Sequence, residues 1–175
     1  MDSKSSIIFE RNSVEFVTVA AELCNFLEEA EGMPRARFVD TVMKILPLLY
    51  VKALLLPEGI EHMSLDEPES YVTEDIYEGM RSMLAGIMGD RDDYLDVFVE
   101  EMKYSDQPVT CHISEDIADI YQDIKNFVFV FRQGLNQTMN DALAICRDNF
   151  AQYWGQKLVN TLRALHEVRF QADGE

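Results

Sequence analysis

The chain contains 175 residues and has a mass of 20.1 kDa, a length that favours one domain with a single hydrophobic core. Hydrophobic residues make up 47% of it and charged residues 27%, as in an ordinary soluble globular protein, while 8 glycines and 5 prolines are too few for the many turns of an all-β fold. The formal net charge of −17 disfavours binding to nucleic acid and to anionic membranes, and it favours cations or a basic protein partner.

The N-terminal third is predicted to form two helices. Asn12 followed by Glu15 is typical of a capping box at the start of the first helix, and Gly32 is a typical stop. Pro34 suits the first turn of the second helix. Pro47 is expected to kink or restart that helix, because proline removes a helical hydrogen bond.

Neither a signal peptide nor a membrane-spanning helix is predicted. The N-terminal segment has only three consecutive apolar residues before Glu10. The most apolar run, Ile45–Pro57, contains a lysine and is about a dozen residues long, whereas a spanning helix needs about 20. The cysteines Cys24, Cys111 and Cys146 are odd in number and form no CxxC pair, which predicts reduced thiols and a cytoplasmic location.

The middle of the chain is more polar. Residues 57–72 are predicted to form a loop, and a third helix is predicted to begin at Thr73 and to end by Gly89. Residues 90–110 show no clear pattern, although residues 94–102 are compatible with one or two helical turns.

Two further helical patterns complete the chain. The fourth helix is predicted to run from Ser114 to about Gln133, with Gly134 as its stop. The fifth pattern keeps apolar residues near one face from Met139 to Val168, and Gly155 would allow it to bend.

These patterns predict a single-domain, all-α bundle of about five helices over residues 1–175, with an acidic loop-rich middle segment and frayed ends at 1–10 and 171–175. The core is predicted to include the central residues of the apolar stripes, namely Leu23, Phe38, Leu49, Ile117, Ile124, Phe150 and Leu162.

The negative charge is unevenly distributed. Residues 58–123 contain 19 acidic and three basic residues, a net charge of −16, whereas the rest of the chain has 13 acidic and 12 basic residues, a net charge of −1. This segment is therefore expected to attract a basic partner. Solubility alone is the alternative explanation of the charge.

The stretch SEDIADIYQDIKNFV contains four carboxylates, Glu115, Asp116, Asp119 and Asp123. On a helix they fall within about 100° of one another, beside the apolar stripe. We predict that they form a solvated band whose border residues, Asp116 and Asp123, can accept hydrogen bonds from a neighbouring helix. Asp116, Asp119 and Asp123 are also the candidate ligands if the stretch binds a metal ion.

The same stretch, together with YWGQKLVNTLRALH at residues 153–166, resembles a family of small, acidic, all-helical bacterial proteins classed as a domain of unknown function. The similarity extends over most of the chain. The resemblance implies a helical fold and supplies no substrate and no catalytic residues.

An enzyme is the second interpretation. Asp116 and Asp119 look like the metal-binding acidic pairs of the all-α nucleoside-triphosphate pyrophosphohydrolases, with Glu28 and Glu31 as the second pair. Aspartates replace that family's glutamates, about 85 residues separate the pairs, and no basic cluster for phosphates is evident. No ExxH, P-loop or GxSxG motif occurs either.

Aromatic residues gather near the middle of the fifth pattern. Phe150 and Tyr153 share the predicted buried face, and Trp154 lies about 100° further round. Core packing is one explanation. The other is a binding anchor made by Tyr153 and Trp154, because tyrosine and tryptophan are enriched in binding hot spots.

We predict from the sequence that the protein is a non-catalytic, cytoplasmic interaction module with an acidic surface that meets a basic protein partner. No cofactor is indicated, and Mg²⁺ enters only under the alternative, a Mg²⁺-dependent pyrophosphohydrolase. Neither nucleic acid nor membrane is an expected partner, and the oligomeric state is left open.

Overall fold

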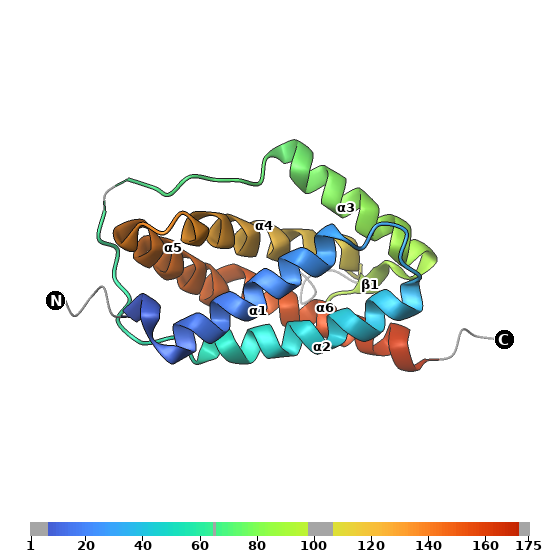
Figure 1. Cartoon of the computed structure of the whole chain (residues 1–175). Helices are drawn as coiled ribbons and strands as arrows, with labels where there is room; N and C mark the ends of the chain where they lie inside the picture. The colour runs from blue at the N-terminus through green and yellow to red at the C-terminus, as the bar shows by residue number, and fades with distance from the viewer. Residues whose placement is uncertain (1–6, 65, 98–106, 172–175) are drawn as a thin grey trace.

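The structure is a computed structural model that describes residues 7–64, 66–97 and 107–171 (Figure 1). Its helices are η1 Ile7–Phe9, α1 Arg11–Glu28, α2 Arg35–Leu54, α3 Glu74–Met88, η2 Gly89–Arg91, α4 Ile113–Arg132, α5 Asn136–Asn149, η4 Phe150–Trp154 and α6 Gly155–Phe170. Its strands are β1 Asp93–Leu95 and β2 Thr110–His112. The helices α5, η4 and α6 follow one another without a break, so the described residues form five long helical segments and the predicted all-α bundle is confirmed.

Helix α4 forms the centre of the bundle. It packs against α1, α3, α5 and α6, and α1 and α2 form an antiparallel pair on the near face in Figure 1. Ile117, Ile120 and Ile124 on α4 are fully buried. Burying each such side chain stabilises the fold by about 1.5–3 kcal/mol. The charged residues of α4 are therefore held on a rigid element.

Several helix ends lie where the sequence predicts them. The Thr73 hydroxyl accepts a hydrogen bond from the Ile76 amide and caps α3. Gly89 and Gly134 follow α3 and α4 with φ of 56° and 75°, a region in which glycine is favoured because it has no Cβ.

The predicted start of the first helix is wrong. Helix α1 begins at Arg11, and its N-cap residue, Glu10, makes no side-chain cap. Asn12 lies inside α1 and not at its N-cap, so no capping box forms, and the Glu15 carboxylate instead pairs with Arg11 at 2.8 Å and with Lys52 at 2.7 Å. These ion pairs fasten α1 to α2 instead.

Pro47 does not restart the second helix. It lies inside α2, which continues to Leu54. Leu46 and Leu49, on either side of the proline, are fully buried. Packing of both halves against the core therefore outweighs the hydrogen bond that the proline removes.

The chain between α3 and α4 contains a short two-stranded ribbon. β1 and β2 are antiparallel, with Asp93 opposite His112 and Leu95 opposite Thr110. Tyr94 lies in β1, so the helical turn considered for residues 94–102 does not form at its start, and residues 98–106 lie outside the described residues.

The two ends of the chain are described only in part. Residues 7–9 form η1, in which Ile8 is fully buried while Phe9 is exposed, so the predicted frayed N-terminus is held against the core at Ile8. Residues 1–6 and 172–175 lie outside the described residues. Within the described ranges, every helix is too short or too polar to cross a membrane.

Candidate functional site

The acidic stretch of α4 is engaged by three other elements. Asp119 accepts hydrogen bonds from the Tyr77 hydroxyl of α3 at 2.7 Å and from the Tyr153 hydroxyl of η4 at 3.3 Å. Its carboxylate also pairs with the Lys157 ammonium of α6 at 2.5 Å. Burial disfavours the charge on Lys157, but the bond to Asp119 outweighs it and raises the pKa of Lys157. Asp119 thus joins α3, α4 and α6 through polar contacts.

The neighbouring acids are also paired. Asp116 accepts a hydrogen bond from the Tyr94 hydroxyl of β1, and Asp123 accepts one from the Asn149 amide of α5 at 2.9 Å. Burial raises the pKa of Asp116 to about 7 and also raises the pKa of Asp123. Glu115 remains exposed. The predicted solvated band is therefore wrong for Asp116 and Asp119, which are buried, whereas hydrogen bonding to neighbouring elements is found.

Asp119 takes part in an ion pair with Lys157 and is therefore not an open carboxylate. The Lys157 ammonium already neutralises the Asp119 carboxylate, at 2.5 Å. In the second proposed acidic pair, Glu28 accepts two hydrogen bonds from Lys125 of α4, at 2.6 and 2.9 Å. Asp119 and Glu28, one acid from each pair, thus contact different lysines. The assignment of Asp116, Asp119 and Asp123 as metal ligands stays a prediction.

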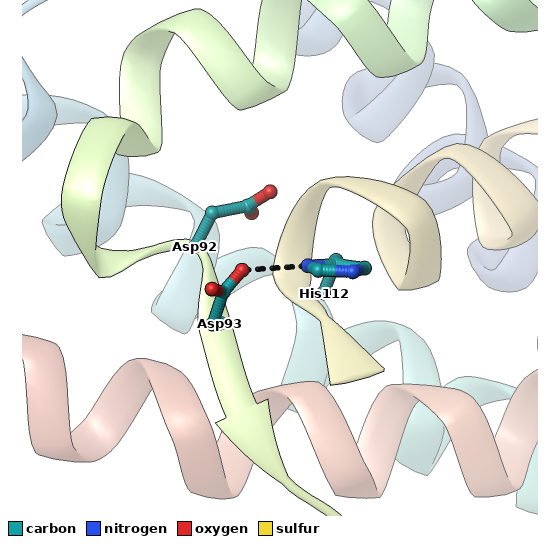
Figure 2. A group of neighbouring side chains, drawn as sticks. All are labelled: Asp92, Asp93 and His112. Atoms are coloured by element: carbon teal, nitrogen blue, oxygen red, sulfur yellow. Dashed lines mark hydrogen bonds and ion pairs between the residues drawn. The ribbon is translucent and has the colours of Figure 1, made fainter. Parts of the chain in front are cut away.

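Asp92, Asp93 and His112 form another cluster, in which one ligand atom from each residue lies within 4.8 Å of the others (Figure 2). His112 Nδ1 lies 2.7 Å from Asp93, its partner across the ribbon. Asp92 accepts hydrogen bonds from the Ser114 amide at 2.7 Å and from the Ser114 hydroxyl at 2.6 Å. Asp92 therefore caps the first turn of α4, and each residue of the cluster already has a protein partner.

The two aromatic candidates for binding differ in exposure. Trp154 is fully buried, and its indole N–H donates to the Cys146 carbonyl at 2.9 Å. Tyr153 is 47% exposed. Trp154 therefore belongs to the core, and only Tyr153 can meet a partner at the surface.

A π-helical turn explains why Trp154 is buried and Tyr153 is exposed. η4 is a π-helical turn, whose hydrogen bonds span five residues instead of four, so the side chains after it are rotated around the axis relative to an uninterrupted α-helix. Leu162, which follows the turn, and Phe150, its first residue, are only partly buried, contrary to the prediction, while the other five predicted core residues are fully buried. A Cβ at Gly155 would lie 2.5 Å from the Phe150 carbonyl oxygen, so glycine is needed where this turn closes.

The described residues also line an open acidic pocket of about 500 Å³ between α4, α5 and the loop before α3. Its rim carries Asp66, Glu67 and Glu69 from the loop and Asp123 from α4. Among the lining residues there is no lysine or arginine, and His62 is the one basic side chain. The pocket therefore has strongly negative surroundings.

Two polar side chains, buried Asp141 and half-buried Asn126, bind the two ends of the loop over this pocket. The Asp141 carboxylate accepts hydrogen bonds from the Met63 amide at 2.6 Å and from the Ser64 amide at 3.0 Å. At the other end, the Asn126 side chain accepts hydrogen bonds from the Tyr71 and Val72 amides, both at 2.8 Å. The acidic residues 66–69 thus lie between two segments of the loop, 63–64 and 71–72, whose amides are hydrogen-bonded to α5 and α4.

Part of the pocket lining is apolar and buried. It consists of Phe127, Val130, Ala142 and Cys146. Burial raises the pKa of the Cys146 thiol well above its usual value, so the thiol stays protonated and is a poor nucleophile. The arrangement suits binding of a group with an apolar stem and a positive end.

Sequence reasoning found only part of this pocket. Of the three candidate metal ligands, Asp123 lines it and the other two do not. The segment 66–70, DEPES, was predicted only as a loop, and its acidic composition was the one available signal. Its position over α4 and α5 depends on Asn126 and Asp141, which carry no recognisable motif.

Replacing Asp116 by asparagine is expected to make stability less dependent on pH. The carboxyl pKa of about 7 in the folded protein exceeds the unfolded value, so wild-type stability should fall as the pH rises from about 4 through 7. Asparagine removes this buried charge and can still accept the Tyr94 hydrogen bond. Urea unfolding should show the variant more stable by on the order of 2 kcal/mol at pH 8 and nearly equal at pH 5.

The matched control is Glu115→Gln, one residue earlier on the exposed side of α4. It should leave the pH dependence unchanged. A wild-type stability that rises between pH 5 and pH 8, with no difference in the Asp116→Asn variant, would contradict a buried Asp116 carboxylate.

The fold and pocket define a small all-α protein with a preformed acidic pocket and no membrane-spanning helix in its described ranges. The chain belongs to the family described as "Domain of unknown function (DUF5063)", whose model matches residues 7–171. It is similar to the crystal structure of protein BF1032 from Bacteroides fragilis, with 56% identity, a TM-score of 0.85, and coverage of 97% of this chain and 99% of that chain. No curated protein matches the chain.

Proposed function

We propose that this protein is a non-catalytic, cytoplasmic interaction module of bacteria that binds a basic segment of a partner protein in its acidic pocket. The observation that carries this proposal is the pocket of about 500 Å³, whose lining carries four carboxylates and neither lysine nor arginine. A cavity of this size falls within the range of about 300–1,000 Å³ used for specific ligands.

The chemistry of the pocket favours a lysine or arginine side chain. The methylene stem of such a residue would pack on Phe127 and Val130, and its charged end would reach Asp123. Asp123 is held by Asn149 and therefore does not have to be ordered on binding. The loop carboxylates then add a field that steers a basic partner toward the pocket.

Two further observations support the part of the proposal that the protein is cytoplasmic and bacterial. Cys24, Cys111 and Cys146 are all free thiols, as expected in a reducing compartment. The similar protein of known structure comes from the bacterium Bacteroides fragilis.

The geometry gives less support to the Mg²⁺-dependent pyrophosphohydrolase. Such an enzyme needs two acidic pairs that converge on one metal ion. Asp119 is paired with Lys157, and Glu28 is paired with Lys125. One acid of each proposed pair is thus neutralised by a lysine.

A binding measurement tests the proposed function. Fluorescence anisotropy with a labelled hexalysine peptide should show saturable binding that weakens by about tenfold or more between about 20 and 150 mM salt, because the attraction is electrostatic. A pocket variant that neutralises the three loop carboxylates, Asp66→Asn, Glu67→Gln and Glu69→Gln, should lose most of this binding.

The control removes equal charge elsewhere. Glu22→Gln, Glu29→Gln and Glu31→Gln together neutralise three exposed carboxylates of α1 and the turn after it. This variant has the same net charge as the pocket variant and should bind hexalysine nearly as well as the wild type. Equal losses in both variants would mean that the peptide responds to overall charge, and the pocket proposal would then be refuted.

A further inference from the structure

A second cavity, of about 630 Å³, has the opposite charge. It lies where the first turn of α2 meets η2 and the last turn of α6, at the right-hand end of the bundle in Figure 1. Four arginines line it: Arg35, Arg37, Arg91 and Arg169. They come from three segments that are far apart in the sequence, so the basic cluster that the sequence did not reveal is created by the fold.

The positive charge of this cavity is only partly neutralised. Its lining contains four arginines and one carboxylate, Asp40, and a second carboxylate, Asp90, pairs with Arg35, which leaves a net charge of +2 in a protein with a net charge of −17. Asp40 lies 3.5 Å from Arg169 and is shared with Lys44 at 3.0 Å. Arg37 makes no ion pair within the described ranges.

One arginine is fixed in place before any ligand binds. The Arg35 guanidinium donates hydrogen bonds to the Met88 carbonyl and to the Asp90 carboxylate, both at 2.9 Å. Both bonds come from one of its terminal nitrogens, Nη1, so the rest of the planar fork remains available for an anion. A preordered cation of this kind lowers the entropic cost of binding.

The start of α2 adds to the attraction. Pro34 is the N-cap residue and supplies no side-chain acceptor, while Arg35, Ala36 and Arg37 of the first turn all line the cavity. The positive end of a 20-residue helix thus faces the same space as the guanidinium groups. Together these groups match an oxyanion with two or more negative charges, because guanidinium forks and helix amides both bind phosphate oxygens.

We propose that this arginine-lined cavity is a binding site for the phosphate group of a small phosphorylated molecule. The volume of the cavity suits a ligand of nucleotide size. It shares no lining residue with the acidic pocket, so the two sites can be tested separately. The free inorganic ion and an organic phosphate present the same group, and the experiment distinguishes them.

Isothermal titration calorimetry with pyrophosphate and with ADP tests the proposal, using the full chain and sodium chloride of equal ionic strength as the blank. We expect saturable binding of at least one probe at millimolar concentrations or below. Arg37→Gln and Arg169→Gln should each weaken binding by about tenfold, the loss expected for one charged hydrogen-bonding partner. The control Arg81→Gln removes an arginine of α3 that pairs with Glu78 outside the cavity, and it should change the affinity by less than about twofold.

The two probes identify the source of the phosphate. Tighter binding of ADP supports an organic phosphate as the ligand, while equal binding shows that the phosphate group alone is recognised. The proposal is overturned if neither probe binds at about 10 mM, or if Arg37→Gln and Arg169→Gln bind like the wild type. Circular dichroism establishes that each variant is folded, and Arg37, which is exposed and unpaired within the described ranges, is a change that the fold should tolerate.

Discussion

Replacing Trp154 by alanine is expected to lower the free energy of unfolding by about 3–5 kcal/mol, the range found for large aromatic side chains in protein cores. Trp154 is fully buried and packs against Phe16 and Phe150, with ring centroids 6.4 and 4.7 Å away. The substitution would leave a cavity and remove the hydrogen bond to the Cys146 carbonyl. Chemical denaturation of the two proteins measures the difference.

The preceding residue provides the control. Tyr153→Ala removes an aromatic ring of similar kind from an exposed position and should cost less than about 1.5 kcal/mol, since only a long hydrogen bond to Asp119 and a contact with Lys157 are lost. Equal losses for the two substitutions would contradict the π-helical turn that buries Trp154.

Replacing Asp119 by asparagine is expected to cost about 2–4 kcal/mol at neutral pH. The substitution leaves Lys157 charged without its counterion, and unpairing a buried charge is costly. The cost falls somewhat below that of a fully buried pair because the Lys157 side chain is 25% exposed. Urea denaturation with Asp123→Asn as a comparison gives the measurement.

A double substitution separates the contribution of the Asp119–Lys157 ion pair to stability from the contribution of the surrounding residues. In Asp119→Asn with Lys157→Met, neither charge remains, so much of the stability should return. If the double variant is as unstable as the sum of the two single variants, the ion pair is not the source of the effect.

The sequence was sufficient to predict most of the fold. Helix ends that depend on local chemistry were predicted correctly, as at Thr73, Gly89 and Gly134, because the capping group or the glycine lies next to the end that it determines. The core face of α4 was also predicted, since Ile117 and Ile124 keep an uninterrupted helical spacing.

The wrong predictions concern positions where the local sequence pattern is overridden by the helix geometry or by a contact with a residue distant in the sequence. The wheel for the fifth pattern assumes 3.6 residues per turn, and the π-helical turn before Gly155 breaks that assumption. Glu15 was assigned to a cap, but Lys52 lies across the helix pair and binds it. Neither outcome has a signal within a short window of sequence.

Both cavities escaped prediction for the same reason. The acidic pocket needs the described loop residues 62–64 and 66–70 to lie against α4 and α5, where Asn126 and Asp141 accept hydrogen bonds from the loop backbone. The arginine-lined cavity gathers residues 35, 91 and 169, which come together only in the folded bundle. Charge counts along the chain indicated an acidic middle segment but could not show where either cavity lies.

Amide chemical-shift mapping with hexalysine tests the central claim, that the acidic pocket binds a basic segment. The shifts are predicted to be largest at Asp123, Asn126 and Asn149, which line the pocket, and to saturate together. Amides of the N-terminal turn of α2, beside the arginine-lined cavity, should not move. Small shifts spread evenly over the acidic surface, or no saturation at these three residues, would contradict the account.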